Sequence, residues 1–451
     1  LSVIEEQSLL IDPPDQNALI NFPDNNHAHK IYSKYGIGLW ILYLPFVALG
    51  KLLAFVTSTP DRVVIDFLIS FVNPCFGIMG LYFFKNIQKN LGISETRSNL
   101  SVFTLALLTF YWKYSTTDFS EIIQATSLLG IFYYISKKED FMLIGVSFWL
   151  SFLISIKIIF VILIPAIGIY TIFVNKNKNL ASVYKDIAYL SSFLLPLGAS
   201  ILFYNYIRYE SIFETGYGKE STMFSFDYFV RDFFPYVFSL ERGLLIYNPL
   251  LCISFASIFC IPNKQKSFFI LVYAVISIWY LTMCFWQSWH GDYSWGNRFL
   301  VPILPLLFLS FAFTAFQRTF TKIVILLLGI CSLLIQFSAS FTKVHEINQI
   351  QQFIRKDNQS HEANQVLTGI NLFHHKFHSP VPKYSLNSFS LDSSKIIDLS
   401  DYNTFKGFNI WSSQLLNYFN CKTLSYYTGL LIVFSFLVMI IYLFRIKLSV
   451  K

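Results

Sequence analysis

The sequence has little charge and few cysteines for its length. Asp, Glu, Lys and Arg make up 13% of the 451 residues, and there are six cysteines. Apolar residues make up 54% and include 49 phenylalanines, too many to place in one water-soluble core. The net charge of +8 is modest and is explained by basic loops facing anionic lipid headgroups, so a nucleic-acid partner has no support.

The cysteine positions exclude a disulfide framework within one chain. Five of the six lie inside predicted membrane spans, and only Cys421 lies outside them. The chain also shows no signal peptide and begins with "LSVIEEQSLLIDPP", without Met and without a first hydrophobic helix. We therefore expect the natural start to lie upstream of residue 1.

Long apolar runs predict an all-α polytopic membrane protein. A helix needs roughly 20 apolar residues to cross the hydrocarbon, and lipid offers no hydrogen-bond partner to bare backbone groups. The predicted spans are 36–56, 63–84, 99–114, 121–136, 140–156, 157–174, 187–206, 243–261, 267–286, 299–316, 322–341 and 425–444.

Loop charges predict the orientation of these spans. Four loops carry Lys and Arg with almost no acid and are expected on the cytoplasmic side: 175–179, 262–266, 317–322 and 445–451. Alternation then puts on the outer side the segments 115–121, 207–242, 287–298 and 343–424.

The span count contains a conflict before residue 115. An outer N-terminus and a cytoplasmic tail require an odd number of crossings, whereas twelve spans are predicted. The basic stretch "KNIQKNLGISETR" (85–97) looks cytoplasmic, yet it falls outside if both 36–56 and 63–84 cross. We expect one segment in this region to be peripheral or re-entrant.

Four outer stretches combine polar and aromatic residues. The first two are "IYSKYGIGLWILYLPFVALG" (31–50), where Gly36 and Gly38 permit close approach to a helix start, and "YSTTDFSE" (114–121), with Asp118 and Glu121. An interfacial Tyr and Lys belt explains the first equally well. Ordinary helix capping explains the second equally well.

The other two stretches carry the cations. They are "FYNYIRYESIFETGYG" (203–218) followed by "SLERGLLIYNPLL" (239–251), and "WQSWHGDYSWGNRFLVPILPLLFL" (286–309). Glu241 and Arg242 could simply pair at the membrane interface. A Trp belt explains the tryptophans of the last stretch, but it does not call for His290, Asp292 and Arg298 among them.

These stretches, in this order, resemble the bacterial branch of the GT-C glycosyltransferase superfamily, the relatives of protein O-mannosyltransferases and of lipid A aminoarabinose transferases. The resemblance runs from about residue 30 to about residue 310. It implies a GT-C-like bundle of about 11–12 transmembrane helices with an outer-face loop subdomain. It also implies an inverting enzyme of the bacterial inner membrane that transfers one sugar from a polyprenyl-phosphate carrier to a lipid, glycan or protein acceptor on the outer face.

The resemblance suggests roles for particular residues. The family's key acid belongs in the first outer loop, where Glu5 and Glu6 lie near but do not match its position, so the principal base is expected upstream. Asp118 and Glu121 match the second acidic site and are expected to position the acceptor or a metal; a divalent cation is left open. Residues expected around the donor phosphate and sugar are Lys34, Tyr35, Arg242, Trp289, His290, Asp292, Trp295 and Arg298.

The expected organisation is a first outer loop (1–35), a catalytic bundle (36–342), an extracytoplasmic cap (343–424) and a last helix with its tail (425–451). Within the cap, "HHKFH" (374–378) is a weak zinc signal because no second ligand pair accompanies it. Two other functions stay open. One is an O-antigen ligase or polymerase, which uses a similar donor. The other is a lipid-linked glycan flippase, against which stand the missing internal repeat and the polar residues gathered at one face.

Overall fold

The computed structural model describes residues 36–117, 119–137, 142–173, 179–217, 223–289, 291, 294–314, 318–341, 365–366, 424, 427, 431 and 434. The elements formed by these residues are helical, apart from one antiparallel bridge between Phe224 and Trp286. Within this part of the chain, five helical segments are long and apolar enough to cross a membrane: Ile37–Thr57, Asp61–Asn90, Leu180–Tyr209, Asn263–Cys284 and Thr319–Ala339. The chain is therefore an all-α polytopic membrane protein, as its composition predicts.

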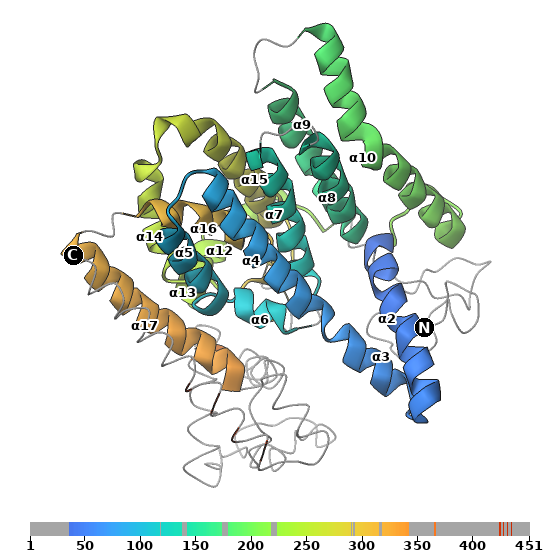
Figure 1. The fold of residues 1–451 in the computed structure, drawn as a ribbon, viewed down its shortest axis with the longest axis horizontal. Coiled ribbons are helices and arrows are strands. Elements are labelled where there is room, and N and C mark those ends of the chain that lie inside the picture. The colour runs from blue at the N-terminus through green and yellow to red at the C-terminus, as the bar shows by residue number, and fades with distance from the viewer. Residues whose placement is uncertain are drawn as a thin grey trace.

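The centre of the bundle is α7 (Glu121–Lys137). It packs between α4 (Val72–Asn90) and α8 (Met142–Ile156), and α8 in turn packs against α10 (Leu180–Tyr209) (Figure 1). Every α7 residue from Glu121 to Phe132 is buried. A Cβ at Gly130 would lie 2.6 Å from the indole of Trp149, so glycine here lets α8 approach α7 closely.

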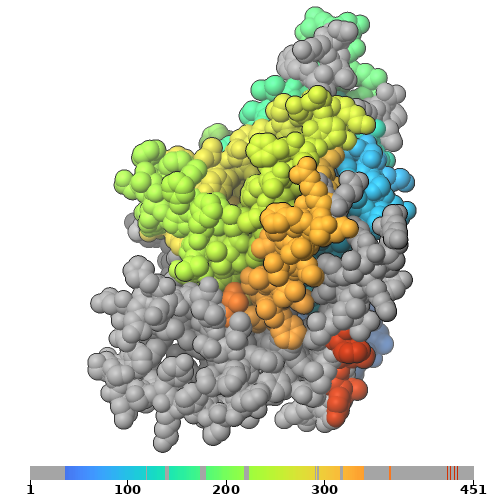
Figure 2. All heavy atoms as spheres, turned by 90° about the vertical axis from the view of Figure 1, so that its left-hand side faces the viewer, coloured from blue at the N-terminus to red at the C-terminus, as the bar shows by residue number. Residues whose placement is uncertain are grey.

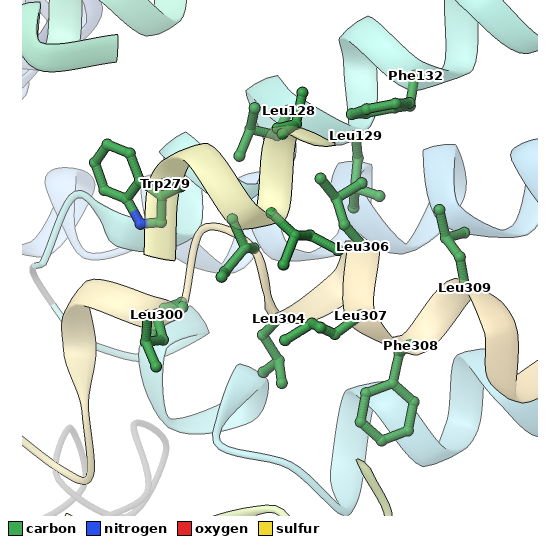
Figure 3. Close-up of a cluster of buried hydrophobic side chains, with 14 of the residues drawn as sticks. Leu128, Leu129, Phe132, Trp279, Leu300, Leu304, Leu306, Leu307, Phe308 and Leu309 are labelled. Atoms are coloured by element: carbon green, nitrogen blue, oxygen red, sulfur yellow. The ribbon is translucent and has the colours of Figure 1, made fainter. Parts of the chain in front are cut away.

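The core lies where α7 meets α15 (Lys266–Cys284) and α16 (Leu304–Phe308) (Figure 3). Figure 3 shows leucine side chains of α7 and α16 gathered between these helices, with Trp279 of α15 beside them. Trp279 of α15 stacks on Phe160 at 4.0 Å between ring centroids, and its indole N–H donates to the carbonyl of Phe299 at 2.7 Å. Phe160 belongs to η2 (Ile158–Leu163), which leads into α9 (Ile164–Phe173).

Two predicted spans, 243–261 and 299–316, are broken rather than continuous helices. The first comprises α13 (Leu244–Tyr247), α14 (Leu251–Ala256) and η4 (Ser257–Cys260). The second comprises η6 (Arg298–Leu300), α16 and η7 (Leu309–Phe313). The cause is proline, which cannot donate a backbone hydrogen bond, at Pro249, Pro302 and Pro305.

The two broken segments pack against each other through hydroxyl groups. The hydroxyls of Ser254 and Ser310 lie 2.9 Å apart, and those of Ser257 and Thr314 lie 2.8 Å apart. The Ser254 hydroxyl also donates to the carbonyl of Leu307. Side-chain hydroxyls thus join segments whose own backbone ladders are interrupted.

A hairpin of α2 (Ile37–Thr57) and α3 (Asp61–Ile69) leaves the bundle at the end where α7 begins, the Glu121 end (Figure 1). At its start α2 meets the last turn of α8, where a Cβ on Gly36 or Gly38 would lie 2.1 Å from an oxygen of Ser155. The expected close approach at these two glycines is therefore to the α8 backbone and the Ser155 hydroxyl. The second half of α2 packs on α3, with Gly50 against Ile65.

The opposite end of the bundle carries Lys89 and Lys264. The Gln265 amide donates to the carbonyl of Leu91, which joins the turn after α4 to the 262–266 loop. The Asn73 amide, at the start of α4, donates to the carbonyls of Thr117 and Phe119 at the Glu121 end. The turn after α4 thus lies beside the 262–266 loop, which is predicted to be cytoplasmic. The basic residues of 85–97 favour the same side for this turn.

This arrangement bears on the conflict in the span count. The sequence predicts separate spans at 36–56 and 63–84, and α2 is apolar and long enough to cross. In the structure α3 and α4 run on almost continuously from residue 61 to 90, whereas α2 packs on α8 at its start and on α3 in its second half. Because α3 continues into α4, we expect α2 to be the segment that does not cross, and this stays a prediction.

The remaining helices close the sides of the bundle. The predicted span 99–114 is divided into α5 (Glu95–Leu107) and α6 (Tyr111–Ser115). Figure 2 shows α17 (Thr319–Phe341) lying across the face between the 243–260 segment and α5. The Gln336 amide of α17 donates to the carbonyl of Tyr247 at 2.8 Å. The predicted span 425–444 lies almost wholly outside the described residues.

Candidate functional site

An ion pair between Glu121 and Arg298 joins two of the stretches singled out in the sequence. The Arg298 Nε lies 3.9 Å from the Glu121 Oε1, and the two side chains are 21% and 8% exposed. Glu121 is the first residue of α7, and Arg298 is the first residue of η6. Glu121 is the more buried partner, so removal of Arg298 would leave its carboxylate without this compensating charge.

A second cation, Lys157, shares an aromatic ring with Arg298. The Arg298 guanidinium carbon lies 5.0 Å from the Phe299 ring centroid, and the Lys157 Nζ lies 5.1 Å from the same centroid. The guanidinium also lies 5.1 Å from the Phe119 ring. Lys157 has an extended backbone (φ −147°, ψ 108°) between α8 and η2, which directs the chain out of the helix at this point.

The loop before Arg298 is held by glycines and by a residue from far along the chain. Gly291 and Gly296 have φ of +69° and +56°, a region that costs other residues energy. The Gly296 N–H donates to the side-chain oxygen of Gln365 at 2.8 Å, and the Gln365 amide donates to the Ser294 carbonyl at 2.7 Å. A residue of the predicted cap thus anchors the loop that carries Arg298.

The two tryptophans of this loop each pack against a tyrosine ring. Trp295 is 1% exposed, packs edge-to-face on Tyr247 at 5.3 Å, and its carbonyl accepts a hydrogen bond from the Tyr114 hydroxyl at 2.9 Å. Trp289 packs on Tyr236 at 5.9 Å. In this state the Trp295 ring is used in packing and is not open to a sugar.

Arg242 lies beside the same cluster. Its Nε is 3.6 Å from the Glu241 Oε1, and its side chain is 4% exposed. The Tyr247 hydroxyl donates to the Glu241 carbonyl, which links this pair to the loop that carries Arg298. Glu121, Arg298 and Arg242 all lie within electrostatic reach of the Tyr114 hydroxyl.

Two short helices, α11 (Phe226–Asp232) and α12 (Pro235–Phe238), flank the cluster. Arg231 binds Asp232 through two hydrogen bonds of 2.5 and 2.6 Å, which raise the pKa of Arg231, and it also donates to the Gln287 carbonyl. Burial raises the pKa of Tyr236, whose hydroxyl donates to the Met283 carbonyl at 3.0 Å. These contacts fix α11 and α12 to the end of α15.

The structure brings together five of the residues expected at the site, and seven lie outside the described part of the chain. Those described are Glu121, Arg242, Trp289, Trp295 and Arg298. Those outside are Glu5, Glu6, Lys34, Tyr35, Asp118, His290 and Asp292, and the "HHKFH" motif is outside as well. Across the described residues, no group of three or more His, Cys, Asp or Glu side chains could hold a metal ion.

Sequence reasoning missed Lys157 and Gln365. Lys157 is a single charge where the predicted spans 140–156 and 157–174 meet, and alternation of the spans places that junction on the outer side. An isolated lysine between two apolar runs was the signal. Gln365 has no such signal, because a neutral amide in a polar segment is not distinctive.

Comparison with known proteins adds no relative to this picture. No protein-family model matches the chain, and no curated protein and no solved structure matches it.

Proposed function

We propose that this chain is an integral-membrane glycosyltransferase. It would move a single sugar from a polyprenyl-phosphate carrier to a lipid, glycan or protein acceptor, with inversion, on the outer face of the bacterial inner membrane. The sequence resemblance suggests the class of reaction, and the geometry of the Glu121 end supports it.

One observation carries the proposal. Glu121, Arg298 and Lys157, from three segments far apart in the sequence, converge around Phe299 at one end of the bundle. A carboxylate beside two cations suits a reaction whose leaving group is a phosphate. Glu121 is also buried in the bundle, where an ionisable group is costly to maintain without a use.

The reaction assigns work to each of these groups. The acceptor oxygen attacks the anomeric carbon, a new C–O bond forms, and the bond to the phosphate oxygen breaks with its electron pair going to the phosphate. Arg298 and Lys157 would stabilise the charge that grows on the departing phosphate. The acceptor proton passes to a carboxylate acting as general base.

Glu121 is assigned a positioning role. Its carboxylate is already engaged by Arg298, so it is suited to orient the acceptor hydroxyl and to fix the guanidinium in place. The principal base stays predicted in the first outer loop. Arg242, which lies beside Tyr247, would also stabilise the negative charge of the departing phosphate.

The test is transfer in membranes that contain the full chain and are supplied with radiolabelled polyprenyl-phosphate sugars. Arg298→Gln and Lys157→Gln should each lower the rate by about 100-fold, the loss typical when one donor to a developing charge is removed. Lys185→Gln, an exposed lysine on α10, is the matched control and should keep the full rate.

The products separate this function from its rivals. One added sugar supports the proposal. Transfer of a whole glycan assigns the chain to the ligase or polymerase class instead, and movement of label across the membrane without a new glycosidic bond assigns it to the flippases. Unchanged rates in both cation variants would refute the roles given to Arg298 and Lys157.

A further inference from the structure

A second polar site lies at the Glu121 end, in a pocket between α2, α8 and α10. Its empty volume is about 330 Å³, including space open to the surroundings. One part of its wall is apolar and consists of Ile37, Ile154, Ile158 and Ile201. The other part is polar and consists of Ser155, Tyr204, Asn205, Arg208, Thr215 and Tyr217.

Arg208 is the charged group of this pocket, and its position is fixed. The residue is only 5% exposed. Its guanidinium carbon lies 3.7 Å from the Tyr204 ring centroid and 4.6 Å from the Tyr209 ring centroid. Its Nη2 donates to the Asn205 side-chain oxygen at 2.9 Å. A guanidinium held by two aromatic rings and a side-chain amide is prepared to bind an anion with little loss of side-chain entropy.

The chain after Arg208 turns back and supplies the rest of the polar wall. Glu210 ends α10 in a left-handed conformation (φ +54°), and the loop then turns back. The Gly216 N–H donates to the Glu214 carboxylate at 2.9 Å, which fixes the turn carrying Thr215 and Tyr217. This is the "FYNYIRYESIFETGYG" stretch, which the proposed transfer does not use.

The pocket opens beside a helix surface suited to lipid. α10 is long and apolar enough to span a membrane, and only 11% of its most apolar window is buried. In the last turns before Arg208, the side chains of Phe203, Tyr206 and Ile207 are 65%, 55% and 46% exposed. An amphiphile in the bilayer could therefore approach the pocket along α10 without leaving the membrane.

We propose that this pocket binds the phosphate of a membrane lipid. Arg208 would hold the phosphate, and the four isoleucines would hold the first carbons of the chain attached to it. The pocket is narrow and partly open, so only the phosphate and the carbons next to it would lie inside, with the rest of the lipid along the exposed side of α10. The site uses none of the residues assigned to transfer and stands independently of that proposal.

Two lipids share this chemistry, a bilayer phospholipid and a polyprenyl monophosphate. The experiment uses the purified full chain in a neutral detergent and measures binding by native mass spectrometry. The probes are short-chain phosphatidic acid, a polyprenyl monophosphate, diacylglycerol with the same chains, and inorganic phosphate. Similar binding of both lipids assigns the pocket to any lipid phosphate, and stronger binding of the polyprenyl compound assigns it to a carrier lipid.

The variants test the two walls separately. Arg208→Gln should weaken binding of both phosphate lipids at least tenfold, because it removes a charged donor. Ile201→Phe fills the apolar wall, keeps the charge and should weaken binding similarly. It also keeps the test decisive if Arg208→Gln does not fold. Lys185→Gln, an exposed cation at the other end of α10, should bind normally.

Three results would overturn the inference. Diacylglycerol binding as tightly as phosphatidic acid would show that the phosphate is not recognised. Inorganic phosphate binding as tightly as the lipids would show that the isoleucines do not take part. Unchanged affinity in folded Arg208→Gln, or in Ile201→Phe, would place the lipid elsewhere on the molecule.

Discussion

Gly296 provides a quantitative test of the loop that carries Arg298. Its φ is +56°, and a Cβ placed on it would lie 3.1 and 3.2 Å from two ring carbons of Tyr247. Replacement by alanine therefore meets two obstacles, a left-handed backbone and a crowded neighbour. Two other glycines serve as comparisons, one with the left-handed backbone but no crowding and one with neither. Gly92 has φ +76° with no atom within 4 Å of its Cβ position, and Gly198 lies inside α10 with no atom within 4 Å.

The expected free energies of unfolding follow from this comparison. Gly198→Ala should stabilise the protein by about 0.5–1 kcal/mol, because alanine loses less backbone entropy in a helix. Gly92→Ala should destabilise it by about 1–2 kcal/mol through the left-handed conformation alone. Gly296→Ala should carry that cost and a crowding cost of about 1–3 kcal/mol against the Tyr247 ring, about 2–5 kcal/mol together.

The assay is denaturant-induced unfolding of the three variants and the parent chain in one detergent, followed by tryptophan fluorescence. The expected order of stability is Gly198→Ala, parent, Gly92→Ala, Gly296→Ala. A Gly296→Ala variant that is no less stable than Gly92→Ala would show that the ring of Tyr247 does not lie against the loop. The packing assigned to that loop would then be wrong.

Two further predictions concern the loop anchor and the topology. Gln365→Ala should destabilise the protein by about 1–3 kcal/mol, measured in the same unfolding assay, because it leaves two buried backbone groups of 294–297 without their partner; no change in stability would contradict the anchoring role. In a chain without its six native cysteines, a membrane-impermeant thiol reagent should label Asn90→Cys and Lys264→Cys from one side and Thr59→Cys from the other. Labelling of all three from one side would instead restore α2 as a crossing helix.

Hydropathy correctly predicted long, continuous apolar helices such as α15 and α17. The predicted span 267–286 corresponds to α15 (Lys266–Cys284), and 322–341 corresponds to α17 (Thr319–Phe341). The prediction was wrong about continuity in 243–261 and 299–316, although Pro249 and Pro305 were visible. The predicted span 36–56 corresponds to α2, which is long and apolar enough to cross, and whether it crosses stays a prediction.

The candidate site was predictable in part. Glu121 and Arg298 were selected because ionisable groups at a membrane boundary are unusual, and the structure pairs them. Their pairing itself depends on how α7 and η6 are placed in three dimensions, which no spacing along the chain reveals. Trp295 was expected beside a sugar, but burial of its ring against Tyr247 depends on a neighbour almost 50 positions away.

The hydroxyl contacts between the two broken segments bear on how this protein is made. Neither 244–260 nor 298–313 has an uninterrupted backbone ladder, so each emerges from the ribosome as a poor candidate for independent insertion into lipid. Ser254 and Ser257 meet their partners Ser310 and Thr314 only after more than 50 further residues have been synthesised. We therefore expect the earlier segment to be stabilised only once the later one is made, and the two to enter the bilayer core as a pair.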